Sequence, residues 1–329
     1  MLLLNMFIYN KILLISSIFM LFTNYSYSNE NNYDKWLISL KSDALQRGIS
    51  EETFNRAMNN VIITPKVKKL DKKQPETQIT FNDYFKRTVN NTRINIGKKK
   101  YEQYKNDLLK IAEVYKVQPR FILSIWGIET NYGTYTGSFS VISSLTTLAF
   151  QGRRAKFFRK QLLDAIEIID KEYIELENMK GSWAGAMGQS QFMPSSYLAY
   201  AQDFDKDGKK DIWNNHLDVF ASIAFYLKSH GWDNSKTWGR EVIVSNKFLE
   251  SYVDNKNESK TLKYWSDNNI LRIDGTKLPY LNLKAYLVLP DGIKGKKFLV
   301  YDNFFTIKKY NASTYYALSI GILADRIKY

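Results

Sequence analysis

Residues 121–133 read FILSIWGIETNYG, and they decide how we interpret the rest of the chain. The run from 121 to 128 is almost wholly apolar, which is typical of a helix buried on all sides. Pro119 suits the first turn of that helix, and Gly133 can end it. Glu129 then lies in the last turn of a buried helix. Because loss of hydration raises the pKa of a carboxylate, Glu129 can hold a proton near neutral pH and act as a general acid.

A glycine-rich polar loop at residues 181–194 reads GSWAGAMGQSQFMP. Its glycines allow a ligand to approach the backbone closely, and its two glutamine amides offer both donors and acceptors. Such a loop suits a ligand rich in hydroxyl and acetamide groups, such as an amino sugar. The next acidic residue after Glu129 is Asp164. No second carboxylate of the kind that most glycosidases use is therefore suggested nearby.

The composition describes a basic protein without cysteine. The formal net charge is +14, and 15% of the residues are aromatic, including 23 Tyr. A strongly positive charge often indicates a protein that binds nucleic acid. The N-terminal residues described below suggest export, and exported proteins rarely encounter nucleic acid. We therefore expect an anionic cell-wall polymer or membrane surface as the counterpart, and no nucleic acid. The alternative is a lysine-rich solvated surface without a partner.

The first 28 residues resemble a secretory signal peptide. Lys11 supplies a positive charge, residues 12–22 form a short apolar run, and Ser26 and Ser28 are small residues at the positions that a signal peptidase reads. A membrane span needs about 20 apolar residues, so we expect cleavage. Because the sequence contains no cysteine, we expect no lipid anchor attached through a cysteine. We expect a periplasmic protein, with an uncleaved N-terminal anchor as the alternative.

The residue pattern predicts an α+β protein that is predominantly α-helical. Helical periodicity recurs through the first 238 residues, whereas residues 241–244, 283–289 and 297–300 alternate like strands. Residues 60–80 are mostly polar, contain two Pro and read as a linker or as a segment draped over the surface. The predicted divisions are a signal peptide at 1–28, an N-terminal helical region at 29–117, a catalytic core at 118–238, a small β-rich domain at 239–309 and a C-terminal helix returning to the core at 310–329.

Seven short motifs together resemble the lytic murein transglycosylase B family, which is glycoside hydrolase family 103. They are GIET at 127–130 with Gly133, RR at 153–154, KGSWAGAMG at 180–188, QFMPSSY at 191–197, DFD at 203–205 leading to Trp213, AFYL at 224–227 with HGW at 230–232, and YN at 310–311 with Ser313. The matches extend over nearly all of the chain after the signal. The resemblance implies that residues 118–238 form a lysozyme-like catalytic core.

The resemblance implies a lytic transglycosylase with one catalytic carboxylate, Glu129. That residue would protonate the glycosidic oxygen between N-acetylmuramic acid and N-acetylglucosamine. It would then act as base toward the C6 hydroxyl of the muramic residue, which closes a 1,6-anhydro ring without consuming water. The substrate-binding residues implied by the resemblance are Ser182, Gln191, Arg153, Arg154, Tyr226, Tyr310, Asn311, Tyr316 and Tyr84. Of these, Gln191 would also orient Glu129, and the two Arg would clamp peptide-stem or lactyl carboxylates.

Residues 203–211 read DFDKDGKKD and have the spacing of an EF-hand calcium loop. The spacing predicts Asp203, Asp205, Asp207 and Asp211 as carboxylate ligands, and the Lys209 backbone carbonyl as another. A standard loop closes with Glu at its twelfth position, which here is Asn214. The resemblance, whose family has a lengthened loop, implies that Asp218 closes the site. We expect a structural Ca²⁺ and no cofactor for the chemistry; the alternative is a polar turn that binds no ion.

Three functions are compatible with the sequence. The first is the transglycosylase, the second a hydrolytic muramidase on the same scaffold, and the third a wall-binding protein without turnover. A water-positioning carboxylate would favour hydrolysis, and none is apparent; the apolar setting of Glu129 argues against a protein without turnover. We expect a monomer that binds peptidoglycan glycan strands. Association with the membrane surface or with other cell-wall enzymes stays open.

Overall fold

The computed structural model describes residues 32–72, 79–252 and 258–327, so the predicted signal peptide lies outside the described residues. The chain forms two compact units. Unit 1 contains the described residues up to Lys72 together with Ile142–Leu176, and unit 2 contains the described residues from 79 to Val141 and from Glu177 to 327. In the described part of the chain, no helix combines the length and the apolar character that a membrane span requires.

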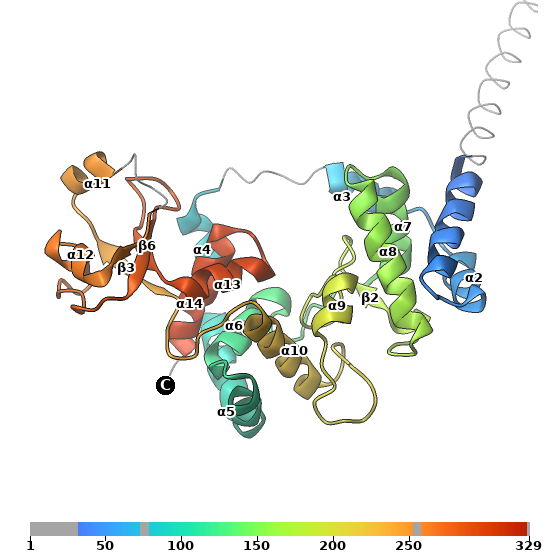
Figure 1. The fold of residues 1–329 in the computed structure, drawn as a ribbon, viewed down its shortest axis with the longest axis horizontal. Coiled ribbons are helices and arrows are strands. Elements are labelled where there is room, and N and C mark those ends of the chain that lie inside the picture. The colour runs from blue at the N-terminus through green and yellow to red at the C-terminus, as the bar shows by residue number, and fades with distance from the viewer. Residues whose placement is uncertain (1–31, 73–78, 253–257, 328–329) are drawn as a thin grey trace, which may run out of the picture. The chain divides into compact units, whose positions relative to one another are not determined.

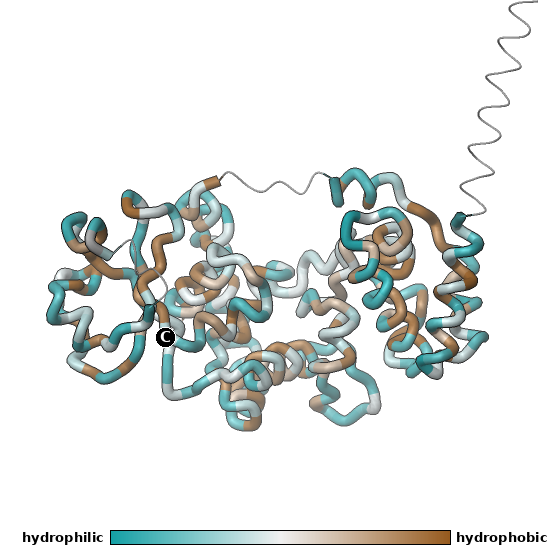
Figure 2. The backbone as a smooth tube through the Cα atoms, turned by 45° about the horizontal axis from the view of Figure 1, so that its top comes forward, coloured by the Kyte–Doolittle hydropathy of each residue, from teal (hydrophilic) through white to brown (hydrophobic). Residues whose placement is uncertain are grey.

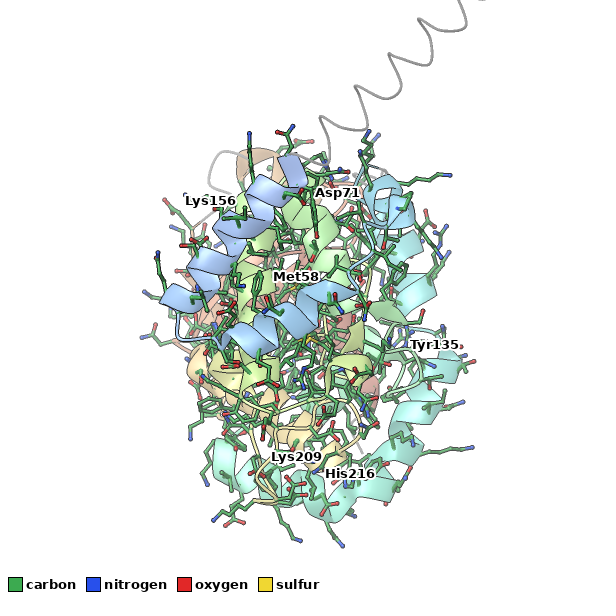
Figure 3. The ribbon with its side chains drawn as sticks, turned by 90° about the vertical axis from the view of Figure 1, so that its right-hand side faces the viewer. Met58, Asp71, Tyr135, Lys156, Lys209 and His216 are labelled. Carbon is green, nitrogen blue, oxygen red and sulfur yellow. The ribbon has the colours of Figure 1, made fainter. Side chains whose placement is uncertain are left out.

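Unit 1 is helical, and its helices are packed through apolar faces. Its elements are a helix at 32–46, α2 (Glu51–Asn59), α3 (Pro65–Lys72), most of α7 (Val141–Gln151) and α8 (Ala155–Asp170). Ser50 caps α2 by accepting a hydrogen bond from the Thr53 amide at 3.2 Å. Asp164 is buried on α8 and accepts from Arg47 and Lys160, each at 2.8 Å, so its charge is paired. Met58 and Asp71, labelled in Figure 3, are buried members of α2 and α3.

The prediction that residues 60–80 form a linker or a draped surface segment is wrong for residues 65–72. Helix α3 occupies Pro65–Lys72 and buries Val67 and Asp71. Pro65 suits the first turn of a helix because its missing N–H has no partner to lose there. The Asp71 carboxylate accepts from the Arg153 amide at 3.2 Å. A lysine-rich helix that buries only one narrow face is easily misread as a loop from composition alone.

Unit 2 is built around α6 (Pro119–Thr130). Its other helices are α4 (Phe81–Thr88), α5 (Asn91–Tyr115), α9 (Pro194–Tyr200), α10 (His216–Ser229), α13 (Asp302–Tyr310) and α14 (Thr314–Ile327). Helix α6 packs against α5, α10 and α14 (Figure 1), and residues 121–127 are all buried. The buried helix predicted from the apolar run is confirmed. Its C-cap is Asn131, in the left-handed conformation at φ 50°, rather than Gly133.

A small sheet and several short helices and strands complete unit 2. The antiparallel sheet has the order β4 (Lys260–Thr261), β6 (Lys284–Val288), β7 (Phe298–Val300), β3 (Gly239–Ile243) and β5 (Leu271–Arg272). Helices α11 (Asn246–Tyr252) and α12 (Leu262–Asp267) contribute Leu249 and Trp265 to its core. The predicted strands are confirmed to within two residues at each end. A two-stranded ladder, β1 (Phe139–Ser140) with β2 (Lys180–Gly181), and the 3₁₀ helix Leu176–Asn178 were not predicted.

The two units divide the helices differently from the predicted ranges. Helices α4 and α5 were assigned to an N-terminal region, but α5 packs on α6 and α10 through Ile94, Leu108 and Ile111. Most of α7 and all of α8 were assigned to the catalytic core, but α8 packs on α2 in unit 1. The reason is tertiary, since each amphipathic helix packs where its apolar face is covered and not by its rank in the sequence.

Helix α14 passes so close to Trp238 that only glycine fits at the crossing. A Cβ on Gly321 would lie 2.1 Å from the Trp238 ring. We predict that Gly321→Ala lowers the free energy of unfolding by about 1–3 kcal/mol, because overpacking forces the ring or the helix to move. Thermal or urea denaturation measures this change. A melting temperature equal to that of the wild type would contradict the packing described here.

Candidate active site

Glu129 is presented by the last turn of α6, at the end of the buried helix. Its Oε1 accepts a hydrogen bond from the Tyr316 hydroxyl of α14 at 2.7 Å. The side chain keeps a partly exposed surface although it lies deep among protein atoms. Burial raises the pKa of Glu129 to about 7, and the hydrogen bond from Tyr316 opposes that rise. The predicted rise is therefore seen, and the carboxyl group can both give and take a proton near neutral pH.

Tyrosines from four helices gather around this carboxylate. Burial raises the pKa of Tyr84, Tyr310 and Tyr316, and the charge of Glu129 contributes to each rise. The ring of Tyr226 lies 4.8 Å from that of Tyr310, and its hydroxyl donates to the Lys309 carbonyl at 2.6 Å. The structure thus brings together all four predicted groove tyrosines, from α4, α10, α13 and α14. Neutral phenols beside Glu129 can donate hydrogen bonds without adding charge.

Asn311 follows Tyr310 directly, and its side chain forms a hydrogen bond with a residue close to it in the sequence. It is the C-cap of α13, and its Oδ1 accepts from the Ser313 amide at 3.1 Å. The residue is exposed. Its amide nitrogen is therefore the group through which it could bind a sugar, and its role in binding stays a prediction.

The glycine-rich loop is folded tightly on itself. Ser182 donates from its backbone to the Ala186 carbonyl at 2.8 Å, and its Oγ accepts from the Ala186 amide at 3.0 Å. Gln191 donates from Nε2 to the carbonyls of Thr136 and Gly188 at 3.0 and 2.9 Å. Both recorded hydrogen bonds of the Gln191 side chain brace the loop, and neither reaches Glu129. Its role in orienting Glu129 stays a prediction.

Gln189 joins the catalytic helix to this loop and was missed by the sequence interpretation. Its Oε1 accepts from the Trp126 indole of α6 at 2.8 Å, and its Nε2 donates to the Trp213 carbonyl at 2.7 Å. Its backbone oxygen accepts from the Thr130 hydroxyl at 3.2 Å, one residue after Glu129. Two glutamines lie in the same motif, and sequence alone does not say which one contacts the helix that carries Glu129.

Ser190, between the two glutamines, is fully buried. Its carbonyl accepts from the Tyr310 hydroxyl at 2.5 Å, which ties the loop to α13. Its own Oγ has no hydrogen-bond partner among the described residues. The Tyr310 hydroxyl is thereby directed at the loop backbone and not at Glu129.

Arg153 and Arg154 belong to unit 1, whereas Glu129 belongs to unit 2. Arg153 donates from Nη2 to the Asp71 carbonyl at 2.5 Å. The guanidinium of Arg154 lies 5.3 and 5.1 Å from the ring centres of Phe157 and Phe158. Both side chains are exposed, and their role in clamping carboxylates stays a prediction.

The acidic loop brings three of its predicted carboxylates together. Ligand oxygens of Asp203, Asp205 and Asp218 all lie within 4.8 Å of one another. Burial raises the pKa of Asp218 to about 6, and the charges of Asp205 and Asp203 add to that rise. Three mutually repelling carboxylates are the donor set that a hard cation such as Ca²⁺ prefers, so the residues fit the predicted ion. The loop is mostly hydrophilic in Figure 2.

The other predicted ligands are used by the loop itself. Asp207 accepts from the Lys209 amide at 2.8 Å, and Asp211 accepts from the Trp213 amide at 2.8 Å. The Lys209 side chain is exposed on the loop (Figure 3). Asp218, at the start of α10, accepts from the Phe204 amide at 2.8 Å and so closes the loop from outside the nine-residue pattern.

We predict that Glu129→Gln stabilises the protein at alkaline pH. Folding raises the pKa of Glu129 from 4.5 to about 7, so its ionisation penalises the folded state progressively from pH 4.5 and fully above pH 7. Removing the charge should raise the free energy of unfolding by about 1–3 kcal/mol at pH 8 and leave it unchanged near pH 4. Urea denaturation at both pH values measures this.

The matched control is Glu113→Gln, which removes an exposed carboxylate from α5. This substitution should leave the free energy of unfolding nearly unchanged at both pH values. A Glu129→Gln variant that gains no stability at pH 8 would show that the carboxyl group titrates near its ordinary value.

Comparison with known proteins agrees with this arrangement. The sequence profile described as Transglycosylase SLT domain matches residues 32–325. Membrane-bound lytic murein transglycosylase B of Escherichia coli (strain K12) is 32% identical over 257 residues, which cover 74% of this chain and 66% of that protein. The chain thus spans slightly less than two thirds of the length of this curated relative.

Solved structures extend the likeness to the fold. SltB3 from Pseudomonas aeruginosa, in complex with NAG-anhNAM-pentapeptide, superposes with a TM-score of 0.85 at 39% identity and covers 89% of this chain and 78% of its own. Escherichia coli Slt35 in complex with calcium superposes with a TM-score of 0.75 at 26% identity, over 88% of this chain and 92% of its own. The predicted α-rich, lysozyme-like fold is confirmed. The family resemblance drawn from the motifs is confirmed as well, and the chain belongs to the Transglycosylase SLT domain family.

Proposed function

We propose that this protein is a lytic transglycosylase that cleaves the β-1,4 bond between N-acetylmuramic acid and N-acetylglucosamine in peptidoglycan. The observation that carries the proposal is the carboxyl group of Glu129, whose pKa is about 7. Burial and Tyr316 account for that pKa, and no other carboxylate of the described residues contributes to it. A retaining glycosidase has its second carboxylate about 5–5.5 Å away, where its charge would perturb the first. One carboxylate suits a reaction that needs no activated water.

The reaction follows from a single group that gives and then retrieves a proton. Protonated Glu129 gives its proton to the glycosidic oxygen as the bond from that oxygen to C1 of the muramic residue breaks. The resulting carboxylate accepts the proton of the C6 hydroxyl as O6 bonds to C1, which yields the 1,6-anhydro sugar and restores the acid. Tyr316 donates to Oε1 and stabilises the carboxylate between these steps. Because the nucleophile belongs to the substrate, the ring closure is intramolecular.

The surroundings of Glu129 supply the proposed glycan groove. Tyr84, Tyr226, Tyr310 and Tyr316 offer apolar ring surface for sugars, and Ser182, Gln191 and Asn311 offer polar groups. Arg153 and Arg154 are proposed to meet peptide-stem or lactyl carboxylates. The relative SltB3 was solved with NAG-anhNAM-pentapeptide, which supports a substrate of this class.

The two rival functions are less well supported. A muramidase needs a carboxylate that activates water, and the pKa of Glu129 is set by burial and Tyr316 without a contribution from another carboxylate. A wall-binding protein without turnover would gain nothing from a buried carboxyl group that penalises folding at neutral pH.

We place the protein in the periplasm, exported by the signal peptide at residues 1–28, or held there by that segment if it is not cleaved. The acidic loop is proposed to bind a structural Ca²⁺ through Asp203, Asp205 and Asp218, and Slt35 was solved with calcium. Such an ion would join the loop to α10, which contributes Tyr226 to the groove. No cofactor takes part in the proposed chemistry.

We predict that Glu129→Gln folds and loses cleavage. The amide cannot transfer a proton, so release of soluble muropeptides from purified peptidoglycan should fall at least about 100-fold. Chromatography of the released products measures the rate. Glu113→Gln, the surface control, should cleave like the wild type. Undiminished release by a folded Glu129→Gln protein would refute the assignment of Glu129.

We predict that Ca²⁺ raises the melting temperature and that EDTA lowers it. A ligand that binds only the folded state stabilises it by about 2.7 kcal/mol at 100 times its Kd. Asp205→Asn, which changes an exposed member of the acidic group, should reduce the calcium-dependent shift. A melting temperature that neither Ca²⁺ nor EDTA changes would mean that the loop has no structural ion.

A further inference from the structure

A cavity in unit 2 has three arginines among its lining residues. It has a volume of about 430 Å³ and lies where β3, β5 and α14 meet. Arg240 comes from β3, Arg272 from β5 and Arg326 from α14, and Trp238 and Ile322 supply apolar surface beside them. Its size falls within the range of about 300–1,000 Å³ that is usual for ligand sites.

The three guanidinium groups lack a close ionic partner, although the charge of Arg272 acts on Asp274 and helps to lower its pKa. Among the described residues, none of them forms an ion pair within 4.0 Å. The Nε atoms of Arg240 and Arg272 are buried without a hydrogen-bond partner. Arg240 lies 5.8 Å from the ring centre of Tyr301, whose buried hydroxyl also lacks a partner. Arg240 and Arg272 are half-buried, and a buried donor without a partner is unfavourable, so an anion that accepts from these Nε atoms would be stabilising.

Two of the three carboxylates that border the cavity are paired with cations outside it. Asp325 accepts from Arg120 and from the Trp238 indole, the latter at 2.9 Å. Glu241 accepts from Lys296 at 2.9 Å. Asp274 accepts from the Thr276 hydroxyl at 2.6 Å and from its amide at 2.9 Å. Three arginines and three carboxylates thus line the cavity, and because Arg120 and Lys296 already pair with two of these carboxylates, positive charge is in excess there.

The cavity is separate from the site at Glu129. On α14, Tyr316 points to Glu129, and Asp325 follows nine residues later. At about 100° per residue, these two positions face roughly opposite sides of the helix. A glycan bound at Glu129 consequently leaves the arginine cavity open to another part of the wall polymer.

We propose that this cavity binds the carboxylate-bearing peptide stems of peptidoglycan, as a second attachment point distinct from the glycan groove. The inference rests on the proposed function, which makes the wall the substrate. Planar guanidinium groups pair with carboxylates through two parallel hydrogen bonds, and Trp238 with Ile322 suits aliphatic peptide side chains. When one of two sites on the protein has bound the polymer, the other site meets that polymer at a higher effective concentration.

The test is calorimetric titration of the full chain with a soluble stem tetrapeptide and with the same peptide after amidation of its carboxyl groups. The tetrapeptide should bind, and the amidated form should bind roughly tenfold more weakly or worse. Arg240→Gln and the exposed Arg326→Gln should each weaken tetrapeptide binding roughly tenfold. The second variant keeps the test valid if the first does not fold. The double control Lys98→Gln and Lys99→Gln, which removes exposed charge from α5, should bind like the wild type.

Cleavage of peptide-free glycan strands separates this inference from the proposed function. Arg326→Gln should cleave them at the wild-type rate and bind intact sacculi less well in a sedimentation assay. Absence of tetrapeptide binding, equal binding by the Arg variants, or equally tight binding of inorganic phosphate would overturn the peptide site. Failure of the wild-type protein to cleave the peptide-free strands would instead overturn the proposed function.

Discussion

The hydrogen bond from Tyr316 to Glu129 is the interaction on which the proposed chemistry depends. Burial alone would favour the neutral acid, and a single donor at 2.7 Å offsets part of that effect. The two influences leave the pKa of Glu129 near 7, where one group can act in turn as acid and as base. A strongly acidic group would have no proton to give, and a far weaker acid could not serve as the carboxylate that retrieves one.

The packing of unit 2 holds Glu129 and Tyr316 at hydrogen-bonding distance. Glu129 comes from α6 and Tyr316 from α14, so the bond exists only if the two helices pack as they do. Gln189 ties the end of α6 to the glycine-rich loop, and it reaches the segment after the acidic loop at Trp213. A cation bound by the acidic loop would thus act on the scaffold of the site and not on the reacting atoms. The arginine cavity lies beyond this arrangement, on the far side of α14.

Local signals in the sequence account for the elements that were predicted correctly. The apolar run of α6, Pro119 at its first turn and the strands of the small sheet follow from periodicity and turn chemistry. The tyrosines around Glu129 came from the family resemblance, since each alone reads as a core residue. Three features escaped because they are tertiary: the packing of α5 on α6, the buried face of α3, and the hydrogen bond between Gln189 and Trp126 of α6. The arginine cavity needs residues from 240, 272 and 326 to meet, which no local pattern reveals.

The most direct test of the central claim is mass spectrometry of the products formed from purified peptidoglycan in water enriched in oxygen-18. A single carboxylate acting through the substrate's own hydroxyl predicts muropeptides that are lighter by one water than reducing-end products and contain no heavy oxygen. Reducing-end products that contain oxygen-18 would show that water is the nucleophile. That result would contradict the account and require a second carboxylate beside Glu129.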